Sequence, residues 1–263
     1  MTTIGFLHTA DVHVATFRRL REELAPGWQD LHVVDPGLLA ECRRDGITAG
    51  LAARIDARLH ELAERGADVI VCTCSSLGGH AELRTADMGV PVLRADRPMA
   101  EAAVAAGSRI GVVATVDSTL APTRALLTDA AARAGRAVEL VDVRCPEAFA
   151  LFEAGNLPAY AEKVAQRARA AAPGLDVLVL AQPSAAPAAA LLADLPIPVL
   201  ASPRTAVARA ITEAAPLPAP GPPDGAENPS PSGAAPLPAP GPPDGAENPS
   251  PSGAAPLPAP VDG

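Results

Sequence analysis

Short apolar runs alternate along the chain with longer stretches whose apolar residues recur every three to four positions. The short runs are typical of buried strands and span residues 3–7, 31–34, 68–72 and 90–93. The longer stretches predict helices at 15–24, 47–65 and 99–106, and Leu51, Ile55, Leu59 and Leu62 form one apolar face of the second. This alternation of strand and helix is typical of a parallel sheet covered by helices on both faces.

The same pattern begins again near residue 110. Residues 110–117 align with 4–11, residues 174–184 with 66–76, and residues 197–200 with 90–93. The repetition predicts two similar three-layer α/β domains with parallel sheets, related by a pseudo-twofold axis. We assign residues 1–97 to the first domain and 98–202 to the second, and we expect a last helix at 203–214 to pack back on the first. Corresponding turns from both domains would line a cleft between them, so we expect the active site there.

Residues 215–263 have a different composition. A segment rich in proline, glycine and serine begins at Ala214, repeats from Ala234 and starts a third time at Ala254. Such a composition supports neither a helix nor a sheet and buries little apolar surface. We therefore expect a disordered tail, which is a solvated linker or a product of repeat expansion rather than a docking motif.

Cys74 is the candidate reactive group of the first domain. It follows the apolar strand at 68–72 and enters a turn of small residues, which leads through Gly78 and Gly79 into a helix expected to begin near Ala81. Open α/β sheets bind ligands at the carboxyl ends of their strands. The N–H groups of a helix start also favour a thiolate and any carboxylate beside it. The alternative is that Cys72 and Cys74 are both small buried apolar residues.

Composition and charge limit the kinds of molecule that the protein is expected to bind. The chain has 263 residues, of which 48% are hydrophobic, enough for the cores of one large or two small domains, and its net charge of −9 argues against nucleic-acid binding. No apolar run is long enough to cross a membrane, and the four cysteines fit free thiols in a reducing cytoplasm. Neither a Cys-x-x-Cys motif nor a histidine pair suggests a metal site. We expect a small-molecule ligand and neither a metal nor a nucleotide cofactor. The sequence leaves the oligomeric state open, with a homodimer as one option.

Two segments of the first domain carry a family resemblance. A duplicated chain with Ile-Gly-Phe-Leu-His-Thr at 4–9 and Val-Cys-Thr-Cys-Ser-Ser at 71–76 resembles the aspartate/glutamate/hydantoin racemase superfamily over residues 3–214. The resemblance implies a cofactor-independent racemase or isomerase that holds a small amino acid or related carboxylate between two cysteines and transfers its α-proton. Cys74 matches the first cysteine, and Ser75 and Ser76 fit the context of that cysteine in the family. Thr9 matches a hydroxyl position, and His8 stands where glutamate racemases usually carry an acidic residue.

The second half departs from that family pattern. Gln182, Pro183 and Ser184 align with residues 74–76, where the family has Cys-Thr-His or a similar sequence. A glutamine side chain is neither an acid nor a base near neutral pH. Racemisation would therefore need Gln182 to orient a water molecule or Ser184 to relay a proton. The alternatives are a single-cysteine decarboxylase, a cis-trans isomerase of a small dicarboxylate, and a non-catalytic protein that binds a small acid.

An enediolate formed without a metal needs hydrogen-bond donors already in place. The hydroxyl candidates are Thr9, Ser75, Ser76, Thr115, Ser118, Thr119 and Ser184, although ordinary helix capping is the favoured role of Ser118 and Thr119. Among His8, His13 and His80, we expect His8 to lie best for the cleft because it ends a strand. Arg94 and Arg97 could bind a carboxylate or pair with Asp96, and we expect the structural pairing. The predicted catalytic residues are thus Cys74, Gln182 and Ser184, and the predicted substrate-binding residues are His8, Thr9, Ser75, Ser76 and Thr115.

Overall fold

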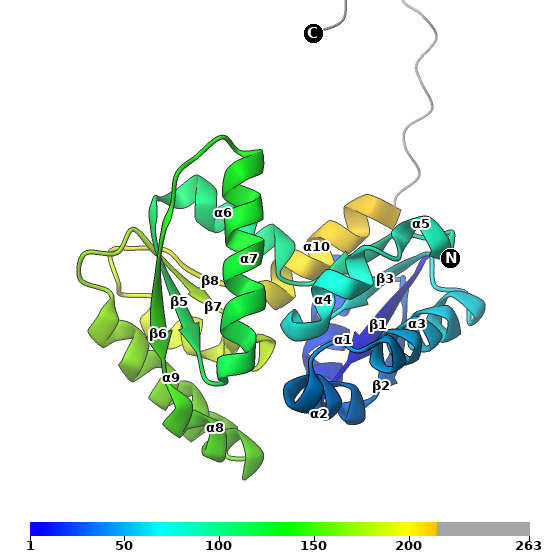
Figure 1. Cartoon of the computed structure of the whole chain (residues 1–263), viewed down its shortest axis with the longest axis horizontal. Coiled ribbons are helices and arrows are strands. Elements are labelled where there is room, and N and C mark those ends of the chain that lie inside the picture. The colour runs from blue at the N-terminus through cyan, green and yellow to red at the C-terminus, as the bar shows by residue number, and fades with distance from the viewer. Residues whose placement is uncertain (215–263) are drawn as a thin grey trace, which may run out of the picture. The chain divides into compact units, whose positions relative to one another are not determined.

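The computed structural model describes residues 1–214, which contain two four-stranded parallel sheets (Figure 1). The first sheet has the order β2-β1-β3-β4, and its strands are β1 (Thr3–His8), β2 (Gln29–Val34), β3 (Val69–Cys72) and β4 (Val92–Arg94). The second has the order β6-β5-β7-β8, and its strands are β5 (Arg109–Ala114), β6 (Glu139–Arg144), β7 (Val177–Leu180) and β8 (Val199–Ala201). The prediction of two α/β domains with parallel sheets is confirmed. The predicted tail lies outside the described residues.

The two sheets repeat each other in register as well as in order. Ile4 of β1 lies opposite Val69 of β3, and Ile110 of β5 lies opposite Val177 of β7. These are the residues that the internal sequence alignment pairs, since it matches position 4 with 110 and 69 with 177. The duplication seen in the sequence is therefore a duplication of structure.

Helices connect the strands and cover both sheets. In the first half these helices are α1 (Val12–Leu24), α2 (Pro36–Asp45), α3 (Ala49–Glu64), α4 (Ser75–Glu82), α5 (Thr85–Met88) and α6 (Arg97–Ala106). In the second half they are α7 (Asp117–Arg133), α8 (Pro146–Glu153), α9 (Leu157–Ala171), the 3-10 helix η1 (Pro183–Leu192) and α10 (Ser202–Ala214).

Two features of the first half differ from the sequence prediction. Helix α2 was not predicted, and it begins with Pro36 in the first helical turn, where the missing N–H of proline costs no hydrogen bond. Helix α4 begins at Ser75 rather than near Ala81, so that Cys74 is its N-cap residue. Gly78 and Gly79 consequently lie inside α4, although glycine usually weakens a helix.

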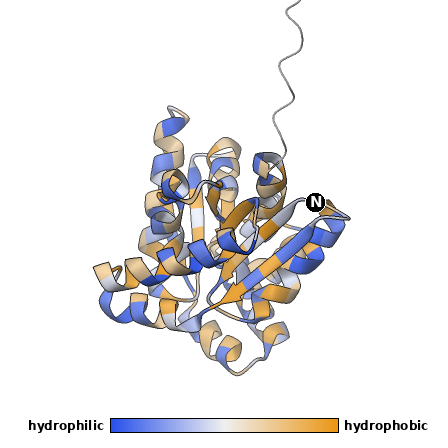
Figure 2. Ribbon diagram, turned by 90° about the vertical axis from the view of Figure 1, so that its right-hand side faces the viewer, coloured by the Kyte–Doolittle hydropathy of each residue, from blue (hydrophilic) through white to orange (hydrophobic). Residues whose placement is uncertain are grey.

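Each sheet has a hydrophobic cluster on either face, as expected for three layers. In the first half, Leu51, Ile55, Leu59 and Leu62 of α3 are all fully buried against one face, which confirms the apolar stripe predicted for this helix. Figure 2 shows long hydrophobic stretches on the strands, whereas the outer helices mix hydrophilic and hydrophobic residues. The core is therefore built mostly from small aliphatic side chains, as the low aromatic content requires.

The last helix of each half packs on the sheet of the other half. Helix α6 follows β4 but buries Met99 and Ala103 against strands β5 and β7. Helix α10 follows β8 but buries Ala206 and Val207 against strands β1 and β3, and it lies beside α6 and α1 (Figure 1). This exchange of helices ties residues 1–214 into one compact unit.

Glycine is required at the same position of both central strands. A Cβ atom on Gly5 of β1 would lie 2.9 Å from Cβ of Ala67, and one on Gly111 of β5 would lie 2.5 Å from Cδ1 of Leu175. Ala67 and Leu175 occupy aligned positions just before β3 and β7. The Ile-Gly pair shared by the two halves is therefore explained by close packing of the chain that enters the neighbouring strand.

Within residues 1–214, no helix combines the length and the apolar character that crossing a membrane requires.

Candidate active site

A cavity lies between the two halves, where the turns after β1, β3, β5 and β7 meet. Its apolar lining includes Leu39, Phe149 and Phe152. The polar residues that line it are Thr9, His13, Arg43, Thr73, Cys74, Ser75, Ser76, Thr115, Ser118, Thr119, Gln182 and Ser184. Parallel strands bring their carboxyl ends to one edge of a sheet, so the two aligned sheets present four such turns to one cavity. The structure thus brings together seven of the eight predicted site residues.

Cys74 is positioned by the first turn of α4. It has extended backbone geometry as the N-cap residue and is 8% exposed. Burial raises the pKa of the Cys74 thiol above its ordinary value, and hydrogen bonds from the Thr9 hydroxyl and from the N–H groups of Leu77 and Ser76 only partly offset this. The expected donors are therefore present, but desolvation outweighs them. The resting group at neutral pH is the thiol rather than the thiolate.

His8 does not line the cavity, although it was expected to lie best for substrate. It points to the same face of β1 as Phe6 and is fully buried. Its Nδ1 lies 2.9 Å from Oγ1 of Thr73, and its Nε2 lies 2.8 Å from Nδ1 of His32, which in turn contacts Asp30. Burial, together with the neighbouring His32 and His13, lowers the pKa of His8 to about 3. Both ring nitrogens are occupied within the protein, so His8 supports the Thr73 turn from behind.

His13 is the histidine that reaches the cavity. It lies in the first turn of α1 and is 9% exposed, and desolvation lowers its pKa to about 4. A neutral imidazole can donate or accept a hydrogen bond to a ligand. His80, the third candidate, instead contacts Asp56, with 2.8 Å between Nε2 and Oδ1.

Ser75 and Ser76 join the two halves across the cavity wall. The Ser75 hydroxyl donates to the backbone carbonyl of Ala181 at 2.9 Å, and the Ser76 hydroxyl donates to that of Ser118 at 3.5 Å. The side chains predicted to bind substrate thus hold the turns after β3, β7 and β5 together.

Gln182 is likewise engaged within the protein. Its Oε1 accepts a hydrogen bond from the Thr115 N–H at 3.2 Å, and its Nε2 donates to Oγ1 of Thr119 at 3.2 Å. It therefore braces the turn after β5 and the first turn of α7. Ser184 lies on the same wall, with its Oγ 2.9 Å from the hydroxyl of Tyr160.

The electrostatic environment of the cavity favours an anion. Arg43 is the one Lys or Arg among the lining residues of this cavity, and its guanidinium lies 5.1 Å from the ring centre of Phe149. Within residues 1–214, no Asp or Glu side chain lines it. Helices α4 and α7 also start at its wall, and helix N-termini carry partial positive charge.

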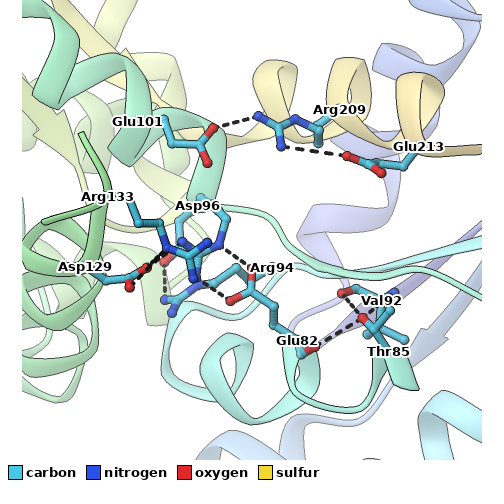
Figure 3. A network of polar contacts seen from close by, with 11 residues as sticks. Glu82, Thr85, Val92, Arg94, Asp96, Glu101, Asp129, Arg133, Arg209 and Glu213 are labelled. Atoms are coloured by element: carbon cyan, nitrogen blue, oxygen red, sulfur yellow. Dashed lines mark hydrogen bonds and ion pairs between the residues drawn. The ribbon is translucent and has the colours of Figure 1, made fainter. Parts of the chain in front are cut away.

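Ion pairs beside the cavity hold α4 against its neighbours. Arg94 binds Asp96 through two contacts of 2.7 and 3.0 Å, which confirms the predicted structural pair. Arg97 pairs with Glu82 of α4 and with Asp129 of α7, the latter at 2.7 Å, rather than with Asp96. Figure 3 shows Arg94 beside Asp96 and the pair of Glu101 with Arg209, which connects α6 to α10. The Arg94–Asp96 pair is buried, and the Arg97–Asp129 and Glu101–Arg209 pairs bridge the two halves.

Residues 1–214 hold no group of three or more His, Cys, Asp or Glu side chains that could bind a metal ion. All four cysteines are free. Burial raises the pKa of Cys72 to about 12, so this thiol is inert packing beneath the Cys74 turn.

Sequence reasoning missed Arg43, Phe149 and Tyr160. Arg43 lies on the unpredicted α2, while Phe149 and Tyr160 lie on α8 and α9, outside the segments that the internal alignment covers. The one usable signal was composition, because Tyr160 is the only tyrosine in the chain. A single tyrosine in a mostly aliphatic chain is a candidate for a specific hydrogen bond through its hydroxyl.

Comparison with known proteins bears on both the fold and the family. The family model described as Asp/Glu/Hydantoin racemase matches residues 31–210. No curated protein matches the sequence. Among solved structures, the chain is similar to the aspartate racemase of Picrophilus torridus, with 14% identity, a TM-score of 0.63, and coverage of 81% of this chain and 94% of that one.

Two other racemases give similar values. A glutamate racemase of Bacillus anthracis has 15% identity and a TM-score of 0.62, with 80% of each chain covered. The allantoin racemase of Klebsiella pneumoniae has 22% identity and a TM-score of 0.60, with 81% of this chain and 87% of that one covered. These likenesses support the fold, and the family model, which spans well over half of the chain, establishes the family. The protein is a member of the Asp/Glu/Hydantoin racemase family.

Proposed function

We propose that the protein is a cofactor-independent isomerase of the racemase type, which transfers a proton at the α-carbon of a small carboxylate. The observation that carries the proposal is the position of Cys74, at the start of α4, in a cavity that both halves line. A thiol at such a position can exchange a proton with a bound ligand. Membership of the racemase family supports the same reaction class.

The surroundings of Cys74 suit the charge that such a reaction develops. Removing an α-proton places negative charge on the carboxylate oxygens, and donors that are already oriented stabilise this charge most effectively. The cavity offers the helix start at α4 and the hydroxyls of Thr9, Thr115 and Ser184. Cys74 is a neutral thiol at rest, so it must first release its proton to solvent; the thiolate then takes the α-proton from carbon, and the thiol so formed returns a proton to the enediolate.

The charge of the cavity favours a particular kind of carboxylate. Arg43 matches an anionic group, whereas an α-ammonium group would find no charged acceptor among the lining side chains. A substrate without a free ammonium therefore fits better than a free amino acid.

A decarboxylase is the second candidate function, and one observation favours it. Cys74 is the only cysteine that lines the cavity, and it is held as a neutral thiol. Loss of carbon dioxide from a malonate leaves an enediolate that needs one proton donor on one face. A single neutral thiol supplies that proton, whereas racemisation needs a group for each face. A cis-trans isomerase with a nucleophilic cysteine is less well matched, since the nucleophile is the thiolate.

Proton NMR in deuterium oxide tests the proposal. The protein is incubated with 2-hydroxy acids, amino acids, substituted malonates, maleate and a hydantoin, and the α-proton signal is followed. We expect its loss with at least one acid, and Cys74→Ala should reduce the rate by at least about a thousandfold. Chiral analysis of the product separates racemisation from decarboxylation.

Cys145→Ala is the matched control, because Cys145 is a buried cysteine that does not line the cavity. It should retain the wild-type rate once its folding is verified. Equal binding of an acid by wild type and Cys74→Ala, with no reaction of any acid, would instead identify a non-catalytic binding protein.

A further inference from the structure

Tyr160 places a phenol behind the cavity wall that the second half supplies. It lies on α9, is 1% exposed and is the largest fully buried side chain of the described residues. Its hydroxyl is 2.9 Å from Oγ of Ser184 and 3.5 Å from Oγ1 of Thr115. Ser184 and Thr115 both line the cavity, whereas Tyr160 does not. The three hydroxyls therefore form a cluster with two members facing the ligand and one behind them.

The position of the phenol is fixed by its surroundings. The ring packs on Phe152, with 5.5 Å between ring centres, and α9 is capped by the Asn156 side chain, which accepts from the N–H of Ala159. The backbone of Thr115 is held in turn by Gln182. A tyrosine with this little freedom can orient the hydroxyls it contacts without a further entropic cost on ligand binding.

In each of these two hydrogen bonds either oxygen can be the donor. A phenol has one proton to donate, and burial raises the pKa of Tyr160, so the group keeps that proton. The contact with Ser184 is much the shorter of the two. When Tyr160 donates to Ser184, the serine oxygen is already satisfied as an acceptor, and its own proton remains available to a ligand. Hydrogen bonds arranged in such a chain polarise and strengthen one another.

We infer that Tyr160 is a positioning residue, which donates to Ser184 so that the Ser184 hydroxyl donates to a carboxylate or enediolate oxygen of the bound substrate. This inference rests on the proposed function and adds to it how the second half contributes without a cysteine. Ser184 would stabilise charge on the substrate oxygens, while Cys74 exchanges the proton at carbon. The phenol itself stays protonated throughout and transfers nothing.

A double-mutant cycle tests the inference, using the acid that the deuterium-exchange panel identifies. Ser184→Ala should lower kcat by about a hundredfold, as the loss of one donor to a developing oxyanion does. Tyr160→Phe keeps the ring and should lower kcat by about tenfold, with KM changed less. In the Ser184→Ala background, Tyr160→Phe should have no further effect, because the phenol acts through the serine. The same loss in both backgrounds would contradict this role.

Two further measurements separate positioning from a general loss of structure. The thermal unfolding midpoints of the variants show whether each is folded, and the pH dependence of kcat should keep its wild-type shape in Tyr160→Phe, because the phenol does not titrate. Thr115→Val removes the other hydroxyl in contact with the phenol and should leave the Tyr160→Phe effect in place.

Malonate binding distinguishes failure of this inference from failure of the proposed function. If no acid shows exchange that depends on Cys74, the proposed function fails by itself. The cycle is then repeated on malonate affinity, measured by NMR titration. The positioning role is supported if Ser184→Ala weakens malonate binding and the added Tyr160→Phe substitution weakens it no further. Unchanged affinity in both single variants overturns it.

Discussion

Cys74 shows how burial and hydrogen bonding compete at one residue. The start of α4 and the Thr9 hydroxyl both favour a thiolate, yet the sulfur lies deep enough that desolvation dominates and the pKa is raised. A substrate that carries negative charge would raise this pKa further, since like charges repel. Cys74 is therefore better suited to give a proton to a carbanion than to attack a double bond, which is why acid-base chemistry is the function proposed here.

Arg43 gives a prediction at the same scale. Arg43→Met keeps the length of the side chain and removes its charge, so the KM for an anionic substrate should rise by about tenfold. The kcat should change by less than about twofold, because Arg43 is exposed at the edge of the cavity. Arg43→Lys should recover part of the loss, although lysine cannot reproduce the planar contact with Phe149.

Arg44→Met is the matched control for that prediction. The neighbouring Arg44 is exposed, pairs with Asp45 at 2.7 Å and does not line the cavity. Its substitution should leave KM unchanged, and steady-state kinetics at two salt concentrations would show a salt dependence that only Arg43→Met weakens. An unaltered KM in Arg43→Met would mean that the anion is bound by the helix start alone.

At the scale of elements, α4 both presents Cys74 and contacts the second half. Its first turn donates through Ser75 to Ala181, and its last turn contributes Glu82 to the Arg97 pair. Gly78, in the middle of the helix, lets α4 approach the buried Arg94 side chain of β4. The helix is thus held at both ends and along its length, which fixes the position of the thiol.

Two adjacent glycines in α4 provide a matched pair of substitutions. A Cβ on Gly78 would lie 2.9 Å from Cβ of Arg94, whereas a Cβ on Gly79 would lie 3.6 Å from the end of the same side chain. Gly78→Ala should therefore lower the free energy of unfolding by about 1 to 3 kcal/mol and reduce turnover by displacing Cys74. Gly79→Ala should raise it by about 0.5 to 1 kcal/mol through better helix propensity. Urea unfolding of both variants checks this, and equal effects would show that Arg94 yields freely.

The strands were predictable because their apolar runs recur in two aligned halves, and the same argument located Cys74. The start of α4 was not predictable, because Gly78 and Gly79 disfavour a helix locally, and the close contact with Arg94 that explains Gly78 is a tertiary one. The prediction that His8 would face the cavity was wrong for a similar reason. His8 and His13 both lie near the end of β1, and the pleat of the strand turns His8 into the core while the start of α1 brings His13 to the cavity. Sequence spacing does not encode that choice.

At the scale of the described chain, residues 1–214, the two halves are joined by contacts that also form the cavity. Exchange of α6 and α10 buries apolar surface, and Ser75, Ser76 and Arg97 add polar contacts between the halves. A duplicated fold provides matching turns for a central site, and here Gln182 and Ser184, with the buried Tyr160 behind them, stand in the turn that corresponds to Cys74 and Ser76. The symmetry of the fold is therefore retained while the chemistry of its two halves differs.

The buried histidines make the stability of the whole chain depend on pH. His8 and His13 have folded pKa values of about 3 and 4, below the value of 6.5 for an unperturbed histidine. Between these limits the unfolded chain binds more protons than the folded one, so stability is complete above about pH 6.5 and falls as the pH is lowered. At pH 5 each histidine should cost on the order of 2 kcal/mol relative to pH 7.

Thermal unfolding at pH 7, 6 and 5 checks this dependence. Two other titratable groups, His32 and Asp30, lie on one side of His8, and His32 also has a lowered pKa. Carboxylates with lowered pKa values, such as Asp30, lose their contribution to stability only at lower pH. The fall in unfolding midpoint between pH 7 and 5 should therefore be smaller in His13→Asn than in the wild type. The same smaller fall is expected in His8→Asn. His60→Asn, at an exposed histidine, should keep the wild-type dependence. A midpoint that stays constant from pH 7 to 5 would show that the folded protein admits protons to these sites, and the neutral His13 assigned to the cavity would then have to be abandoned.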